Sequence, residues 1–292
     1  MHRKAYINRG VYIFMKIINK AAALAALSVL FVSAAFAAPL DSFKGQKGKL
    51  DIAGGTAHIP VMREAAKRIM GMNRDIHITI AGGGSGVGVK QVGEGLVEIG
   101  NTGRALKPAE IEKYGLVSFP FAIDGVAVVV NPANKVKELS FAQLADIYSG
   151  QITNWKEVGG DDGVINLYGR EDGSGTREVF TDKAIKKGSV AASANVVSSN
   201  GAMKTAVAKD ARAIGYVGIG HIDKTVHGVK LEGMVPTQEH AASGSYKVVR
   251  DLYMNTKGAP AGLTALFINY IFSPEGQQII KDSGYIPLPA KK

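Results

Sequence analysis

The sequence predicts an α/β fold with mainly parallel sheets. Short apolar or alternating runs, typical of strands, alternate along the chain with segments whose apolar residues recur at helical spacing. Such alternation is the pattern of units in which helices connect parallel strands. Three strand–helix connections also carry Gly together with Ser or Thr, at Thr56, at Ser85 and at 174–176. Because ligands of α/β folds bind where strands open onto helices, these connections are candidate binding loops.

The first 37 residues are typical of a secretory signal peptide. Five basic residues precede or begin the apolar run that ends at Ala37, the stretch contains no acid, and it closes on the small-x-small motif Ala35-Phe36-Ala37. We therefore expect cleavage near Ala37-Ala38, with Met1 or Met15 as the start. The alternative is a membrane anchor, for which the run is short and rich in small residues.

The net charge and the absence of cysteine narrow the classes of function that this chain can have. Without those 37 residues, Lys and Arg fall from 35 to 30 against 25 Asp and Glu, so the net charge falls from +10 to +5. This mild charge, without a long basic run, argues against nucleic-acid binding and suits attraction of a small anion. The chain has no Cys, so it has no disulfides, no thiolate metal site and no lipid-modified Cys. We therefore expect a periplasmic protein.

Periodicity places the individual elements. Strands are expected at 51–54, 76–80, 97–101, 126–130, 164–168, 194–197, 213–218 and 248–254. Helices are expected at 59–70, 89–96, 141–148, 178–187, 200–207, 263–272 and 274–282, with a further start near Pro108.

The glycine-rich segment 82–88 does not fit a nucleotide-binding motif. Gly83 and Gly88 have the outer spacing of a P-loop, but Val89 stands where that motif requires Lys. No placement of G-x-G-x-x-G succeeds either. Two interpretations remain, a tight strand–helix connection or a seat for an anion smaller than a nucleotide.

Residues 170–177, Arg-Glu-Asp-Gly-Ser-Gly-Thr-Arg, predict an anion-binding loop before a helix. Glycine allows close approach of the backbone, first-turn N–H groups are unpaired, and Arg offers a planar fork to an oxyanion. The alternative is an ordinary helix N-cap beside two solvated arginines.

The chain resembles the phosphate-binding component of bacterial phosphate ABC importers, a periplasmic type II solute-binding family. The resemblance spans essentially the whole mature chain and is carried by residues 124–132, 139–155, 170–176, 214–217 and 270–276. It implies two α/β lobes joined by two crossover strands, with a ligand cleft between them. The expected limits are 38–125 and 235–292 for the first lobe and 126–234 for the second.

The resemblance also implies a set of phosphate-binding residues. The first lobe would contribute Thr56, Ala57 and Ser85, and the second Arg170, Ser174, Gly175 and Thr176. Asp172 would orient Arg170, and Arg104 and Arg177 would add charged donors. Solvated surface positions are the alternative for these last two arginines.

Gly103 departs from the pattern of some relatives, in which an Asp at this place accepts a proton from phosphate and so excludes sulfate. An acceptor distinguishes the two anions because a buried unpaired lone pair repels an unprotonated oxygen. With Gly here, Asp172 or a backbone carbonyl is the expected substitute.

The predicted function is capture of inorganic phosphate in the periplasm by a monomer that delivers it to an ABC permease. The rivals are a binding protein for sulfate, molybdate or tungstate, an oxyanion-sensing module, and a phosphatase. An enzyme is disfavoured because the histidines are scattered without metal spacing and no Gly-x-Ser-x-Gly elbow is present. No cofactor or metal is expected.

Overall fold

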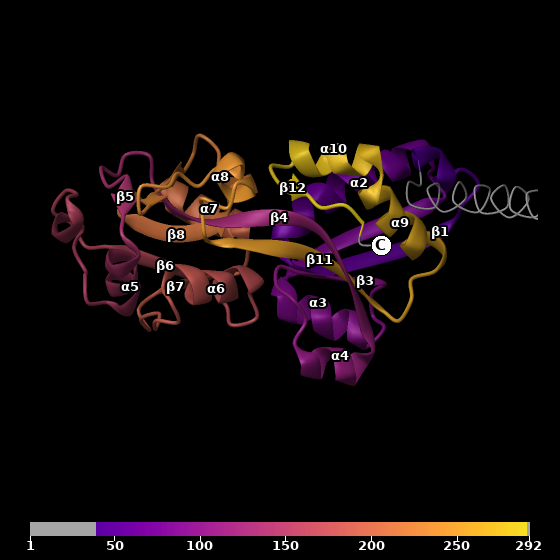
Figure 1. Cartoon of the computed structure of the whole chain (residues 1–292), viewed down its shortest axis with the longest axis horizontal. Coiled ribbons are helices and arrows are strands. Elements are labelled where there is room, and N and C mark those ends of the chain that lie inside the picture. Colours follow the sequence, from indigo (N-terminus) through magenta and orange to yellow (C-terminus); the bar gives the residue numbers. More distant parts are fainter. Residues whose placement is uncertain (1–38, 291–292) are drawn as a thin grey trace, which may run out of the picture.

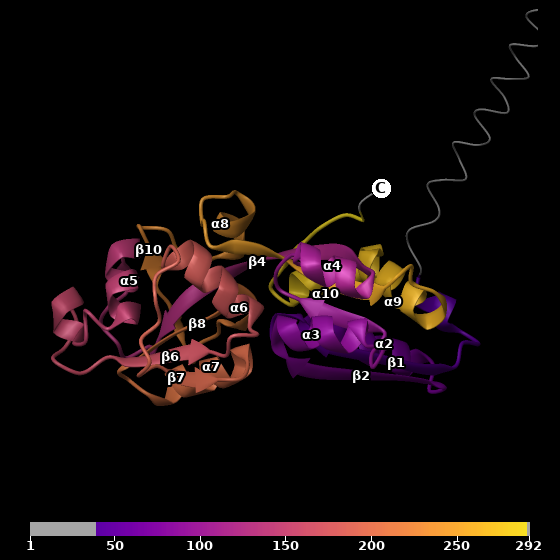
Figure 2. The same ribbon diagram turned by 90° about the horizontal axis from the view of Figure 1, so that it is seen from below.

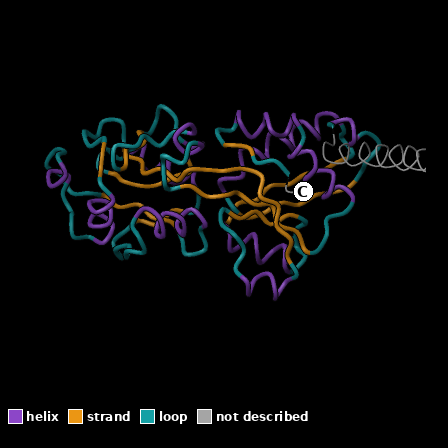
Figure 3. The backbone as a smooth tube through the Cα atoms, in the orientation of Figure 1, coloured by secondary structure: helices purple, strands orange, loops and turns teal. Residues whose placement is uncertain are grey.

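The computed structural model describes residues 39–290 and shows two lobes lying side by side (Figure 1). In both lobes helices surround a layer of strands (Figure 3), which confirms the predicted two-lobed α/β class. The expected signal peptide, residues 1–37, lies outside the described residues.

The helices are α2 (Ile59–Met72), α3 (Gly84–Gly93), α4 (Pro108–Tyr114), α5 (Phe141–Ser149), α6 (Gly175–Val179), α7 (Asn200–Lys209), α8 (Gln238–Ala242), α9 (Gly262–Phe272) and α10 (Pro274–Asp282). The strands are β1 (Gly48–Gly54), β2 (Ile76–Gly83), β3 (Ile99–Thr102), β4 (Leu116–Val130), β5 (Glu138–Leu139), β6 (Asn166–Arg170), β7 (Asn195–Val197), β8 (Ala213–Gly218), β9 (His227–Gly228), β10 (Lys230–Leu231), β11 (Val249–Lys257) and β12 (Ile286–Pro287). Single-turn segments are η1 (Leu40–Phe43), η2 (Thr56–His58), η3 (Trp155–Val158) and η5 (Ile219–His221), and α6 continues into the π-helical segment η4 (Phe180–Ala184).

The strands form the order β2-β1-β3-β11-β4 in the first lobe and β4-β8-β6-β7 in the second. The pairs β1–β2, β1–β3, β6–β8 and β6–β7 are parallel, whereas β11 pairs antiparallel with both β3 and β4, and β4 pairs antiparallel with β8. The sheets are therefore mixed, not mainly parallel as the sequence suggested. The antiparallel pairs arise where the two long strands run between the lobes.

Each lobe has its own hydrophobic core. The first is built on Ile52, Val61 and Phe267, and the second on Val128, Tyr148 and Tyr216. The segment 235–248, which the sequence placed in the first lobe, packs on the second core through Ala241, Tyr246 and Val248. Figure 2 accordingly shows α8 over the second lobe, at the left.

Close packing by glycines fixes the position of α3 beside β1 and β3. A Cβ built on Gly88 would lie 2.5 Å from the Asn101 carbonyl oxygen, and one on Gly100 would lie 2.3 Å from the Gly88 carbonyl oxygen. No side chain fits at either position. Residues 82–88, which the sequence predicted as a glycine-rich loop, form the end of β2 and the first turns of α3. Helix α3 begins at Gly84.

Among residues 39–290, none of the helices has both the length and the apolar composition needed to cross a membrane.

Candidate anion-binding site

A small cavity of about 10 Å³ lies where the two lobes meet. The three predicted strand–helix connections converge on it, together with Arg170, which ends β6, and Arg250, which lies in β11. Its lining residues are Gly55, Thr56, Ala57, His58, Gly84, Ser85, Gly103, Arg170, Ser174, Gly175, Thr176 and Arg250. A larger hollow of about 200 Å³ in the second lobe is lined in part by Trp155, but the buried arginines Arg170 and Arg250 lie at the small cavity.

The lobes are closed on this cavity by hydrogen bonds that cross between them. Asn200 donates from its backbone and side-chain nitrogens to the Thr56 hydroxyl oxygen at 3.3 and 3.0 Å. The Gly86 N–H donates to the Gly173 carbonyl at 3.0 Å. The structure is therefore that of a closed two-lobed protein.

The four hydroxyl groups of the cavity each accept a hydrogen bond from the protein, which leaves their own hydrogens free to be donated to a ligand. Those of Ser85 and Ser174 accept the Gly103 and Arg177 N–H groups at 3.0 and 3.2 Å. That of Thr176 accepts from Arg250 Nη1 at 2.9 Å, and that of Thr56 accepts from Asn200. Because a hydroxyl has one hydrogen and two lone pairs, each hydrogen stays available to an acceptor in the cavity. This arrangement suits an anion.

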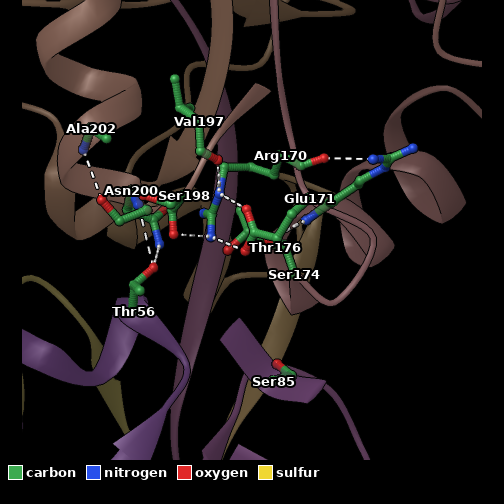
Figure 4. A network of polar contacts seen from close by, with 12 residues as sticks. Thr56, Ser85, Arg170, Glu171, Ser174, Thr176, Val197, Ser198, Asn200 and Ala202 are labelled. Atoms are coloured by element: carbon green, nitrogen blue, oxygen red, sulfur yellow. Dashed lines mark hydrogen bonds and ion pairs between the residues drawn. The ribbon is translucent and has the colours of Figure 1, made fainter. Parts of the chain in front are cut away.

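Arg170 is the most deeply buried cation of the site, at 1% exposure. Its Nε and Nη2 donate to Glu171 at 3.1 and 2.9 Å and to the carbonyls of Val197 and Ser198 at 2.9 and 3.2 Å (Figure 4). Its Nη1 is buried without a hydrogen-bond partner among the described residues. An unpaired buried donor is unfavourable, so this nitrogen requires an acceptor, which an oxyanion in the cavity would supply.

Arg250 is the second arginine of the cavity, and the sequence reasoning did not select it. Its Nη2 and Nε donate to one carboxylate oxygen of Asp124 at 2.7 and 3.1 Å, and its Nη1 binds Thr176. A Cβ on Gly103 would lie 2.7 Å from that Nη1, so the glycine leaves room for the guanidinium. The available signal was a charged residue at an inward-facing position of a strand, because Arg250 occupies every second position together with the buried Leu252 and Met254 and so lies on the same face.

The remaining three predicted residues do not line the cavity. Arg104 donates to Glu110 at 2.7 Å and forms an ion pair with Glu178 of the second lobe at 2.9 Å. The hydrogen bond to Glu110 raises the pKa of Arg104. Asp172 is 94% exposed at its side chain and pairs with Arg177, which also donates to the Arg170 carbonyl at 2.6 Å. The expected orientation of Arg170 by Asp172 is therefore not observed, and the neighbouring Glu171 contacts Arg170 instead.

Two buried ionisable side chains at or next to the cavity, His58 and Tyr216, are neutral at pH 7. Burial, with a further contribution from Arg250, lowers the pKa of His58 to about 3. Burial also raises the pKa of Tyr216 to about 12, and its hydroxyl accepts the Arg170 N–H at 3.0 Å. Within residues 39–290, no three His, Cys, Asp or Glu side chains gather as metal ligands would.

Two closed lobes around a buried seat of hydroxyls and arginines define a solute-binding protein, and residues 42–275 match the PBP superfamily domain. The phosphate-binding protein PstS of Bacillus subtilis (strain 168) is 37% identical over 258 residues, covering 86% of each chain. PstS of Pseudomonas aeruginosa is 30% identical over 275 residues, covering 85% of each. The chain belongs to the PstS family of phosphate-binding proteins.

Solved structures agree with this assignment. A putative phosphate ABC transporter substrate-binding protein with bound phosphate from Clostridium perfringens superimposes with a TM-score of 0.78 at 35% identity, covering 82% of this chain and all of that one. An ABC-type phosphate transport receptor from Vibrio cholerae gives 0.67 at 34% identity, with the same coverage. These relatives are named as binding proteins or receptors, not as enzymes.

Proposed function

We propose that this protein binds inorganic phosphate in the periplasm and delivers it to the membrane permease of a phosphate ABC transporter, as a monomer. Family membership supports the ligand and the transporter. The signal-peptide pattern of residues 1–37 supports the compartment.

The observation that carries the proposal is the unpaired Nη1 of Arg170 beside four hydroxyls held as donors. A tetrahedral oxyanion offers several oxygens at once, and charge-assisted hydrogen bonds in a site shielded from water are strong. Direct ligand contacts are assigned to Thr56, Ala57, Ser85, Arg170, Ser174, Gly175, Thr176 and Arg250. Arg104, Asp172 and Arg177 are assigned supporting roles outside the cavity.

Capture requires the lobes to open and close, and β4 and β11 are the connections that must bend. β4 pairs with β11 in the first lobe up to Gly125 and with β8 in the second lobe from Val126. Closure by hinge bending at such connections is typical of periplasmic binding proteins. We propose residues 39–125 and 249–290 as the first lobe and 126–248 as the second.

Calorimetric titration of protein that has been unfolded, stripped of ligand and refolded tests the function. We expect tight binding of phosphate with one site per chain, and no heat from nitrate or chloride. Binding of molybdate or tungstate in preference to phosphate would overturn the assignment of the ligand. Gel filtration with light scattering tests the monomer.

A further inference from the structure

Two buried atoms without partners, of opposite character, belong to residues that line the same cavity. Among residues 39–290, Arg170 Nη1 is a donor without an acceptor, and His58 Nε2 is a ring nitrogen without a hydrogen-bond partner. His58 has no exposed surface, so bulk water does not reach it. A buried polar atom that nothing satisfies is uncommon, and a ligand is one explanation.

The hydrogen bond at the other ring nitrogen sets the tautomer of His58. Its Nδ1 lies 3.1 Å from the Gly55 carbonyl oxygen, which can only accept, so Nδ1 carries the hydrogen. In a neutral ring Nε2 is then a bare acceptor. The ring is neutral at pH 7 because burial and the Arg250 guanidinium oppose its protonation more strongly than the nearby carbonyls of Gly55, Tyr253 and Thr102 favour it.

The other side chains of the cavity offer hydrogens. The four hydroxyls and Arg170 Nη1 donate, and Arg250 is a cation. Asp124 and Glu171 are paired with the arginines and are absent from the lining. A carboxylate at position 103 would have to share its space with Arg250, since even a Cβ there would lie 2.7 Å from Nη1. His58 is thus the side-chain acceptor of the described lining.

Building on the proposed binding of phosphate, we propose that His58 Nε2 accepts a hydrogen bond from the protonated oxygen of hydrogen phosphate and thereby excludes sulfate. Hydrogen phosphate provides both an anionic oxygen for Arg170 Nη1 and an O–H for Nε2. Sulfate carries no proton at neutral pH, so one of its oxygens would face the Nε2 lone pair. This contact should favour phosphate over sulfate by about 10- to 100-fold in the dissociation constant, the range for a buried polar atom left unpaired.

The test compares dissociation constants for phosphate and for sulfate at pH 7.5 in wild type and three variants. We expect His58→Val to reduce the phosphate-to-sulfate preference by about 10- to 100-fold, and His58→Gln, whose amide oxygen can accept, to keep more of it. His221→Gln is the matched control, because His221 is another histidine whose pKa burial lowers, to about 4, and it does not line the cavity. Its preference should equal that of wild type.

Nitrogen-15 NMR of wild type gives an independent result even if His58→Val fails to fold. We expect the Nε2 resonance to move upfield, as a ring nitrogen does on accepting a hydrogen bond, with phosphate and not with saturating sulfate. An unchanged preference in folded His58→Val, or an Nε2 resonance indifferent to phosphate, would overturn the role of His58. Failure of wild type to bind phosphate would instead overturn the proposed function.

Discussion

The Arg170 guanidinium has the two properties that an anion site needs. It is held in a fixed position, and one of its nitrogens, Nη1, has a hydrogen to donate to a ligand. Four hydrogen bonds hold the guanidinium, two to Glu171 and one each to the carbonyls of Val197 and Ser198, while Nη1 has no partner among residues 39–290 and can bind a ligand. The planar fork of arginine makes this possible, and a lysine ammonium cannot reproduce it.

Arg170→Lys should therefore weaken phosphate binding strongly. Removing one member of a buried charged hydrogen bond reduces binding by about 2–5 kcal/mol, equivalent to about 30-fold or more in the dissociation constant. Calorimetry measures it, and Arg68→Lys, on α2 with its side chain 33% exposed, is the control. Equal affinities for the two variants would refute a role of Arg170 in binding.

Gly103→Ala should disturb the second arginine. The added methyl group would lie 2.7 Å from Arg250 Nη1, which Asp124 and Thr176 hold in place. We expect phosphate binding to weaken and the free energy of unfolding to fall by about 1–3 kcal/mol, as for other overpacked sites. Gly71→Ala, where a Cβ meets nothing within 4 Å, should cause neither change, and urea unfolding compares the two.

His58 should make the fold sensitive to acid. Its pKa falls from 6.5 to about 3 on folding, so between these values the unfolded chain binds a proton that the native protein does not. Stability from this group is complete above pH 6.5 and decreases as the pH falls, by up to about 1.4 kcal/mol per pH unit. The free energy of unfolding should be measured in urea between pH 6.5 and 5 for wild type and His58→Gln. Its dependence on pH should be weaker in His58→Gln by about this amount. An equal dependence in the two proteins would contradict the neutral buried state of His58.

The sequence located part of this site because Gly, Ser and Thr at strand–helix connections leave a recognisable local pattern. Seven of the predicted residues, among them Arg170 and Thr176, line the cavity. Arg250 and His58 were not selected, since their positions depend on pairing between segments far apart in the chain. Arg104 was assigned to the ligand by family resemblance, whereas its guanidinium pairs with Glu110 and with Glu178, and Glu178 lies 74 positions away, a separation that no local pattern reveals.

At the scale of elements, most helices and strands lie where periodicity placed them, with shifted ends. α2 extends two residues past the predicted 59–70, and β4 begins at Leu116, well before the predicted core of 126–130. The early start of β4 was hidden by Pro120, because proline is disfavoured inside strands. The segment 82–88 was read as a loop because glycine disfavours helix, but close packing of α3 requires glycine there.

Contacts between elements of opposite lobes should stabilise the closed state. Arg104, which follows β3, reaches Glu178 on α6 in the second lobe at 2.9 Å. Glu178→Gln should weaken phosphate binding by about 2- to 5-fold, because a partly exposed ion pair contributes up to about 1 kcal/mol. The effect should shrink at 1 M salt. Glu112→Gln, on α4, is the control for loss of an acidic charge, and a similar loss of affinity there would contradict the specific role of Glu178.

At the scale of the whole molecule, ligand binding should stabilise and compact both lobes together. A ligand that binds only the folded, closed state adds about 2.7 kcal/mol to the free energy of unfolding at 100 times its dissociation constant. We expect one cooperative thermal transition to rise with phosphate, and the radius of gyration from X-ray scattering to fall. Two transitions, only one of them shifted by phosphate, would show that the ligand contacts a single lobe.

The two strands that run between the lobes also determine the order in which the two lobes can be completed as the exported chain folds. The second core is drawn almost entirely from the continuous stretch 126–248, whereas the first needs β11 from near the C-terminus. The Asn255 side-chain amide, for example, donates to the Gly100 carbonyl 155 positions earlier in the chain. As the exported chain emerges into the periplasm with its N-terminal end first, the second lobe can fold while residues 39–125 still lack their central strand. The half of the binding site that is translated first is therefore the last to form.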